Sequence, residues 1–166
     1  MTSTHAARLL VAVVVTGTTL VSGTVCSMPL ANADNRRLND AVVANVYTIQ
    51  RQAGCDTEIK INPKLRLAAQ WHTSDVLHDR NLDGDMGSDG SSPQTRADAA
   101  GYRGRASETV AINPALAISG IELINMWYRN PTYLGIMRDC RNSEIGVWSE
   151  SLPDRTVVVA VYGHPG

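Results

Sequence analysis

A polar loop from Asp79 to Gly90 holds the residues whose types and spacing most suggest chemistry. Its first six positions place side-chain oxygens at alternate residues and end on Gly84, as a calcium-binding EF-hand loop begins. The twelfth position is Gly90, where a bidentate glutamate should complete the coordination. Because Asp, Asn, Ser and Gly are also the usual residues of turns, we interpret this segment as a structural loop.

The histidines do not form a metal-binding pattern. His72 and His78 are six residues apart, so they do not share a helical face as a zinc-binding pair would. His72 has helical spacing with the apolar Ala69 and Val76, which indicates a hydrogen-bonded core histidine. The sequence has no Gly-x-Ser-x-Gly elbow, phosphate-binding glycine loop or Cys-x-x-Cys pair. Hydrolytic chemistry would therefore need residues that only the fold brings together.

Two amphipathic helices are predicted before this loop. Apolar residues recur at steps of three and four from Asn35 to about Gln52, and Gly54 ends that helix. Asn62-Pro63 supplies an N-cap and a first-turn proline for a second helix, which runs to about His78. The segment between them alternates in hydrophobicity like a short strand.

Two further helix starts follow the loop. Ser91-Ser92-Pro93 begins a short helix that ends at Gly101, with Gln94 completing a capping box. Asn113-Pro114 begins another, with Leu116, Leu123 and Trp127 in register, and its Gly120 indicates close packing against a neighbour.

The C-terminal part changes to strand patterning. Two β-rich runs, 143–148 and 156–162, are separated by the turn residues 151–154, which predicts a hairpin. Helices followed by strands indicate an α+β fold.

The N-terminus has the features of a secretory signal peptide. A weakly basic start at His5 and Arg8 precedes an apolar run, and Ala31-Asn32-Ala33 offers small residues for cleavage before Asp34. We therefore divide the chain into a removable signal, 1–33, and one domain, 34–166. Thr, Ser and Gly residues between positions 16 and 23 shorten the apolar run below that of a transmembrane helix. A lipoprotein anchor at Cys26 is the alternative, but Val25 stands where a small residue is expected.

The composition of the remaining domain limits its partners. Of 15 basic and 16 acidic residues in the chain, only Arg8 leaves with the signal, so the domain is slightly acidic. No basic stripe is present, which argues against nucleic acid or an anionic membrane as partner. With Cys26 removed, Cys55 and Cys140 form an even pair that predicts one disulfide in an extracellular or cell-envelope protein.

The order of several short motifs resembles the CAP superfamily, which comprises the cysteine-rich secretory, antigen 5 and pathogenesis-related 1 proteins and is also called the SCP domain. The resemblance runs from about Leu38 to Gly163 and is closest to short secreted actinobacterial members. The motifs, in chain order, are Leu38-Asn39, Leu65-x-x-Ala68-Ala69-x-x-His72-Thr73-x-Asp75-Val76, Gly87-Ser88-Asp89-Gly90-Ser91-Ser92-Pro93, Arg96-x-x-x-Ala100-Gly101-Tyr102, Ser107-Glu108-Thr109-Val110-Ala111, Trp127-x-x-Asn130-Pro131-Thr132-Tyr133, Glu144-Ile145-Gly146-Val147 and Val161-Tyr162-Gly163.

The resemblance implies a three-layer α-β-α sandwich with a cleft that holds two histidines and two acidic residues able to bind a divalent metal. Glu108 matches one acidic residue, whereas Asp85 and Tyr133 stand where the family has its two histidines. We name Asp85, Glu108 and Tyr133 as the cleft residues. Without the histidines a family-type zinc site is not expected, and Asp85 with Glu108 could at most hold a hard cation weakly.

Three functions are consistent with this resemblance. The favoured one is a non-catalytic module that binds a small apolar ligand, such as a lipid or sterol, or an envelope or host partner, with Tyr133, Trp127 and Met137 exposed beside the cleft. The alternative is a structural envelope protein without a ligand. A peptidase-like hydrolase ranks last, because losing both histidines removes the natural general base.

Overall fold

The computed structural model describes residues 29–166, so most of the predicted signal peptide lies outside the described residues and remains a prediction. Five helices and four strands follow one another within this range. They are α1 (Pro29–Gln52), β1 (Lys60–Ile61), α2 (Pro63–His78), α3 (Pro93–Ala99), β2 (Gly104–Asn113), α4 (Gly120–Arg129), α5 (Pro131–Arg138), β3 (Glu144–Leu152) and β4 (Arg155–Pro165).

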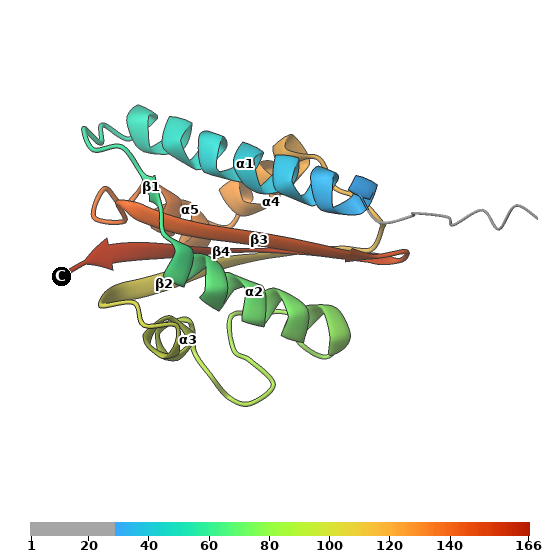
Figure 1. Cartoon of the computed structure of the whole chain (residues 1–166). Coiled ribbons are helices and arrows are strands. Elements are labelled where there is room, and N and C mark those ends of the chain that lie inside the picture. The colour runs from blue at the N-terminus through green and yellow to red at the C-terminus, as the bar shows by residue number, and fades with distance from the viewer. Residues whose placement is uncertain (1–28) are drawn as a thin grey trace, which may run out of the picture.

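The four strands form one sheet in the order β1-β3-β4-β2. The predicted hairpin is confirmed: β3 and β4 are antiparallel, with Leu152 opposite Arg155 at the turn. β2 pairs antiparallel with the other side of β4, and the short β1 runs parallel to β3. Helices α1, α4 and α5 cover one face of the sheet and α2 and α3 the other (Figure 1). The predicted α+β class and three-layer arrangement are therefore confirmed.

The central strand β4 explains why the sheet is covered on both faces. Val158, Ala160 and Tyr162 belong to the core beneath α1, α4 and α5. The alternate residues Val157, Val159 and Val161 belong to the core against α2 and α3. Since successive side chains of a strand point to opposite faces, an unbroken apolar run needs an apolar layer on each side.

One predicted boundary of each of three helices is confirmed by its cap, whereas the first helix begins at Pro29, before the predicted Asn35. Gly54 and Gly101 have positive φ angles of 89° and 85° just beyond α1 and α3, a conformation that glycine adopts readily. The Asn62 side chain accepts a hydrogen bond from Lys64 N, and Pro63 opens α2.

Two predicted details of the helix starts are wrong. Ser92 caps α3 and Gln94 does not complete a capping box; the Gln94 side chain instead bonds Gly104 O and Ala106 N of β2. Asn113 does not begin a helix either, because it pairs with Thr156 at the end of β2. The following helix, α4, starts after Ser119, whose capping box with Glu122 satisfies the first amides.

Two predictions about packing are confirmed. Cys55 and Cys140 form a disulfide across a sequence separation of 85 residues. A Cβ on Gly120 would lie 3.1 Å from Cβ of Ala41, so α4 packs closely against α1. No helix of the described range is long and apolar enough to cross a membrane.

Candidate functional site

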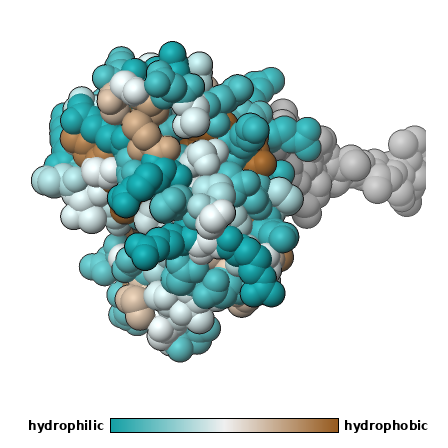
Figure 2. Space-filling model, turned by 90° about the vertical axis from the view of Figure 1, so that its left-hand side faces the viewer, coloured by the Kyte–Doolittle hydropathy of each residue, from teal (hydrophilic) through white to brown (hydrophobic). Residues whose placement is uncertain are grey.

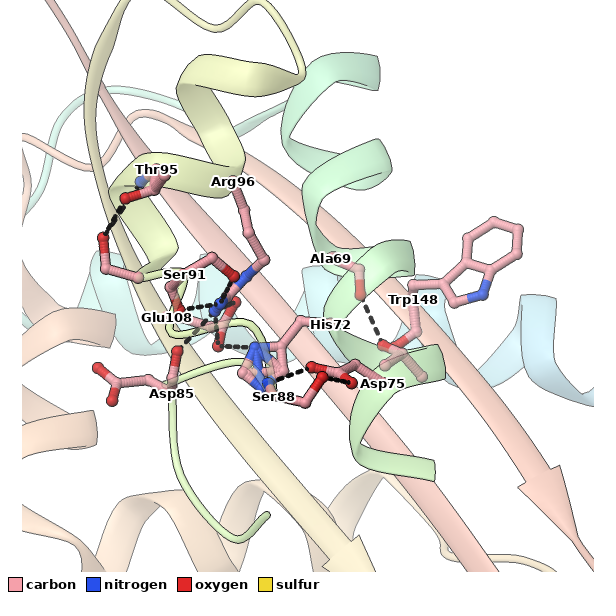
Figure 3. Close-up of polar contacts among 12 residues, drawn as sticks. Ala69, His72, Asp75, Asp85, Ser88, Ser91, Thr95, Arg96, Glu108 and Trp148 are labelled. Atoms are coloured by element: carbon pink, nitrogen blue, oxygen red, sulfur yellow. Dashed lines mark hydrogen bonds and ion pairs between the residues drawn. The ribbon is translucent and has the colours of Figure 1, made fainter. Parts of the chain in front are cut away.

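A buried polar cluster lies where α2, α3 and β2 meet. It consists of His72, Arg96 and Glu108, whose residue exposures are 1%, 6% and 3%. Arg96 Nη2 donates to Glu108 Oε1 at 3.1 Å and to Oε2 at 3.2 Å (Figure 3). Nδ1 of His72 lies 3.2 Å from the same Oε1. The three side chains therefore meet on the face of the sheet that α2 and α3 cover.

Arg96 also fixes the loop that precedes α3. Its Nη2 donates to the main-chain oxygen of Asp85 at 2.7 Å. Its Nη1 donates to the main-chain oxygen of Ser91 at 2.7 Å and to Ser91 Oγ at 3.1 Å. One guanidinium thus joins the 85–91 loop to a carboxylate in the sheet, a use that suits its rigid fork of donors.

A second anchor holds the same loop to α2. Asp75 accepts hydrogen bonds from Ser88 N at 2.8 Å and from Ser88 Oγ at 2.7 Å. Gly87 lies against this anchor, because a Cβ there would be 3.2 Å from Asp75 Oδ2. In the segment 79–84 that resembled an EF-hand opening, Asp79 Oδ1 accepts from Asn81 N at 2.9 Å and from Asn81 Nδ2 at 3.0 Å, as in a hydrogen-bonded structural loop.

Burial sets the protonation of the cluster. It raises the pKa of Glu108 to about 8, against the opposing effect of the Arg96 guanidinium. Burial, together with the charge of Arg96, lowers the pKa of His72 to about 4, so its ring is neutral at pH 7. Neither ring nitrogen of His72 has a well-aligned hydrogen bond within residues 35–166, although Glu108 is close. His72 is thus buried, as predicted, but it lacks the predicted hydrogen bond.

A pocket opens beside this cluster, between α2, α3 and the loop. Its volume is about 410 Å³, which lies within the usual range for small-molecule sites. Trp71, 42% exposed, and Ala99 supply apolar wall, and the polar wall comes from the loop, His72 and Arg96. The polar lining from the loop and its neighbours is Asp75, Ser88, Asp89, Ser91 and Thr95.

The three predicted cleft residues lie on the 85–91 loop, β2 and α5 and differ in exposure. Glu108 is buried behind the pocket, whereas the Asp85 side chain is exposed and only its main chain reaches Arg96. Tyr133 is half-buried on α5; burial raises its pKa, and the charges of Asp85 and Glu108 add to that effect. No ligand contact tests the three as a binding set, which stays a prediction.

Two aromatic and apolar residues predicted to be exposed beside the cleft are in the core. Trp127 is buried on α4 and donates its indole N–H to Val110 O at 3.0 Å, and Met137 is buried on α5. The motif around Trp127 is compatible with either a surface or a core tryptophan. In the structure α4 packs onto β2, and the Trp127 side chain is buried there.

The residues present do not fit a family-type divalent metal. Within the described part of the chain, no group of three or more His, Cys, Asp or Glu side chains is placed to hold an ion. Both Glu108 oxygens already accept from Arg96, and the same nitrogen bridges to Asp85 O. The protein's own guanidinium therefore lies between the two residues that the sequence suggested for a cation.

Comparison with solved structures identifies the architecture. The chain superimposes on an outer surface protein from Borrelia burgdorferi with a TM-score of 0.69 and 12% identity, covering 80% of this chain and 96% of that one. An extracellular protein containing a SCP domain from Bacillus anthracis gives 0.63 and 12%, covering 81% and 41%. A cysteine-rich secretory protein from Staphylococcus aureus gives 0.58 and 12%, covering 78% and 39%.

This chain has the CAP fold. The neighbours named as SCP-domain and cysteine-rich secretory proteins support the resemblance to the CAP superfamily. The chain spans about two fifths of the length of the last two proteins and nearly all of the Borrelia one. No family profile and no curated protein sequence matches the chain, so the likeness is one of fold.

Sequence reasoning missed Arg96, Trp71 and Asp75 as site residues. Arg96 and Asp75 stood in the quoted motifs, but nothing in the sequence paired Arg96 with Glu108, because the two lie on different elements, α3 and β2. The i, i+4 spacing of Trp71 and Asp75 on α2 was the one signal that could have placed them on a common face.

Proposed function

We propose that this protein is an exported, non-catalytic binding module that receives a small, largely apolar ligand in the α2–α3 pocket. The observation that carries the proposal is the pocket itself, about 410 Å³, with Trp71 at its wall and a rigid buried cluster behind it. Ligand sites are commonly concave, preformed and mostly apolar with a few polar groups that set orientation. A lipid or sterol would place only part of its body in a space of this size.

The contacts of the hydroxyl groups support binding over catalysis. Ser88 Oγ donates to the Asp75 carboxylate, which also accepts from Ser88 N, and Ser91 Oγ accepts from Arg96, so neither hydroxyl is bonded to a histidine base. A histidine whose pKa is lowered to about 4 is a weak base at neutral pH. Nucleophilic catalysis needs a base within hydrogen-bond reach of the nucleophile.

The disulfide supports export, because such bonds persist in oxidising compartments.

The surface at the C-terminal end of the molecule does not favour a large protein interface there. Figure 2 shows this end of the molecule as mostly polar, with apolar residues in small separate groups. The size of the pocket, about 410 Å³, favours a small ligand over an envelope partner there.

Native mass spectrometry of the domain with and without a cell-envelope lipid extract tests this function. We expect a bound species of defined mass that survives desalting. Protein that remains bare after incubation with the extract would support the structural, ligand-free alternative. Peptide cleavage by the purified protein that is lost in Glu108→Ala would contradict a non-catalytic role.

A matched pair of variants locates the ligand. Ala99 is exposed and lines the pocket, so Ala99→Trp should fill the pocket and remove the bound species. Ala44 is exposed on α1, on the other side of the sheet, and Ala44→Trp should retain it. Equal retention by both variants would place the ligand elsewhere.

A further inference from the structure

We propose that the polar end of the α2–α3 pocket binds the cationic head group, an ammonium or guanidinium, of a small organic molecule. This inference rests on the proposed binding function and adds the chemical class of the ligand. The shared chemistry would suit either a free amine or a lysine side chain, and the experiment below separates these two sources.

The first observation is the charge of the pocket wall. The carboxylates of Asp75 and Asp89 both line it, and both come with hydrogen-bond donors that keep them oriented. Ser91 N donates to Asp89 at 2.8 Å, and hydrogen bonds from Ser91 hold the pKa of this carboxyl below its usual value. Two acidic side chains on one small pocket favour a positive group.

The second, independent observation is the buried His72. Its ring lines the same pocket, is 1% exposed and has no well-aligned hydrogen bond within residues 35–166. Since Nδ1 lies 3.2 Å from Glu108 Oε1, the atom left without a partner is Nε2. A buried polar atom without a partner is unusual in a folded protein and marks a place where a ligand group can complete the hydrogen bonding. The ring is neutral, so it adds no positive charge that would repel a cation.

Arg96 is the one cationic side chain in the lining; its Nη1 and Nη2 donors are used elsewhere, whereas its buried Nε has no partner within residues 35–166. The Nη1 and Nη2 donors are directed to Glu108, Asp85 O and Ser91. The charges of Asp75, Asp85 and Asp89 all act on His72, so acidic groups outnumber this guanidinium around the pocket even when Glu108 is protonated.

Trp71 completes the site. It lies one helical turn before Asp75 on α2, which places the indole and the carboxylate on neighbouring parts of one helix face. An indole gives apolar contact to the body of a ligand and attracts a cation to its ring face. An aromatic side chain beside carboxylates is a suitable receptor for an organic cation.

Tryptophan fluorescence and calorimetric titration of the disulfide-bonded domain test the inference with three probes of similar size. Benzylamine carries a cation, benzyl alcohol is neutral, and benzoate is an anion. We expect benzylamine to bind at least tenfold more tightly than benzyl alcohol at low salt, with benzoate weakest. Raising the ionic strength should weaken the benzylamine affinity severalfold, because exposed charge interactions are screened.

Three variants assign the affinity to the pocket. Asp89→Asn and Trp71→Ala should each weaken benzylamine binding about fivefold or more, by removing a carboxylate or the aromatic wall. Asp83→Asn is the matched control, since Asp83 is exposed on the same loop and does not line the pocket. Its affinity for benzylamine should equal that of the unmodified protein.

The outcomes separate this inference from the proposed function. Equal binding of benzylamine and benzyl alcohol, with loss in Trp71→Ala, would overturn the cation preference and leave the pocket as a binding site. Loss of affinity in Asp83→Asn equal to that in Asp89→Asn would also overturn it. If none of the three probes bound and Ala99→Trp retained the ligand found in the envelope extract, both the inference and the proposed site would be wrong.

A final comparison identifies the source of the cation. Binding of Nα-acetyl-lysine methylamide as tight as that of benzylamine would indicate a lysine of a partner protein. Binding of benzylamine at least tenfold tighter than the lysine derivative would indicate a free amine with an apolar body.

Discussion

Arg96 donates to both carboxylate oxygens of Glu108, at 3.1 and 3.2 Å, and thereby ties α3 to the edge strand β2. Through Asp85 O and Ser91 the same guanidinium holds the loop that borders the pocket. In the CAP proteins that this chain resembles, a metal-binding tetrad is implied in this region. In this structure both oxygens of Glu108, which the sequence suggested for a cation, accept from Arg96.

Replacing Arg96 by alanine should destabilise the fold strongly. The substitution leaves the buried Glu108 carboxyl without its cation and the 85–91 loop without its anchor. Because burial raises the pKa of Glu108 to about 8, the main loss at pH 7 is that of buried hydrogen-bond partners, about 1–3 kcal/mol for each group left unsatisfied. Urea unfolding should show this loss of the free energy of unfolding.

Arg80→Ala is the matched control for Arg96→Ala. Arg80 pairs with Asp154 at 2.7 Å, but both side chains are well exposed. An exposed pair contributes about 0–1 kcal/mol, so this variant should unfold at nearly the same urea concentration as the parent protein. Equal losses of the free energy of unfolding in the two variants would show that the buried contacts of Arg96 stabilise the fold no more than an exposed ion pair does.

Stability should fall as the pH drops from about 6.5 to 4 through the titration of His72. Its pKa is about 4 in the fold against 6.5 for the free side chain, so folding favours the neutral ring. That contribution is complete above pH 6.5 and is lost as the pH falls through 4, by at most about 3 kcal/mol. His72→Gln should lose less stability over this range.

Glu108 titrates with the opposite sign. Its pKa is raised to about 8, so its neutral form stabilises the fold below pH 4.5 and this contribution is lost as the pH rises through 8. Comparing the pH slopes of the parent and His72→Gln therefore isolates the histidine. A parental slope in His72→Gln would contradict the assignment.

Adding divalent metal should leave the melting temperature unchanged. Arg96 bridges Asp85 O and Glu108, the two residues suggested for a cation. A ligand that binds only the native state raises its stability, and it does so more at higher affinity. Melting curves with about 1 mM ZnCl₂, CaCl₂ or chelator should coincide. A saturable rise with either cation would show that the site accepts a metal despite the guanidinium.

Gly146→Ala should destabilise the packing of α2 on β3. A Cβ at Gly146 would collide with the backbone of Leu65 and Arg66, and backbone atoms cannot move aside as a flexible side chain can. We expect a loss of at least about 1–3 kcal/mol in thermal or urea unfolding.

The control for Gly146→Ala is the same change at Gly135. No atom lies within 4 Å of a Cβ built there, and the residue is inside α5. Alanine in a helix is more stable than glycine by about 0.5–1 kcal/mol, so Gly135→Ala should stabilise. Destabilisation at Gly135, or none at Gly146, would contradict the described packing.

Local signals in the sequence predicted much of the fold. Asn62-Pro63, Gly54 and Gly101 mark helix boundaries because capping depends on a few neighbouring residues. The same reasoning failed at Asn113-Pro114, where strand pairing with Thr156 overrides a helix-start pattern. Long-range pairing is not encoded in one short segment.

The candidate site was less predictable than the fold. Glu108 was chosen from its motif, but its partners come from α2 and α3 and depend on the tertiary structure. His72 follows the core periodicity of α2, so its burial could be predicted and its proximity to Glu108 could not. Trp127 and Met137 were predicted to be exposed beside the cleft but are buried. Their residue types are equally typical of a core and of a ligand surface.

The most direct test of the proposed binding site is a ¹H–¹⁵N NMR titration that follows the three indole N–H signals. Trp71 lines the α2–α3 pocket, Trp127 is buried on the opposite face of the sheet, and Trp148 lies on β3 with its indole bonded to Glu150. Addition of benzylamine should move the Trp71 signal and the amides of residues 88–92 while leaving Trp127 and Trp148 in place. A shift centred on Trp148 or on α1 and α4, with Trp71 unchanged, would contradict the account.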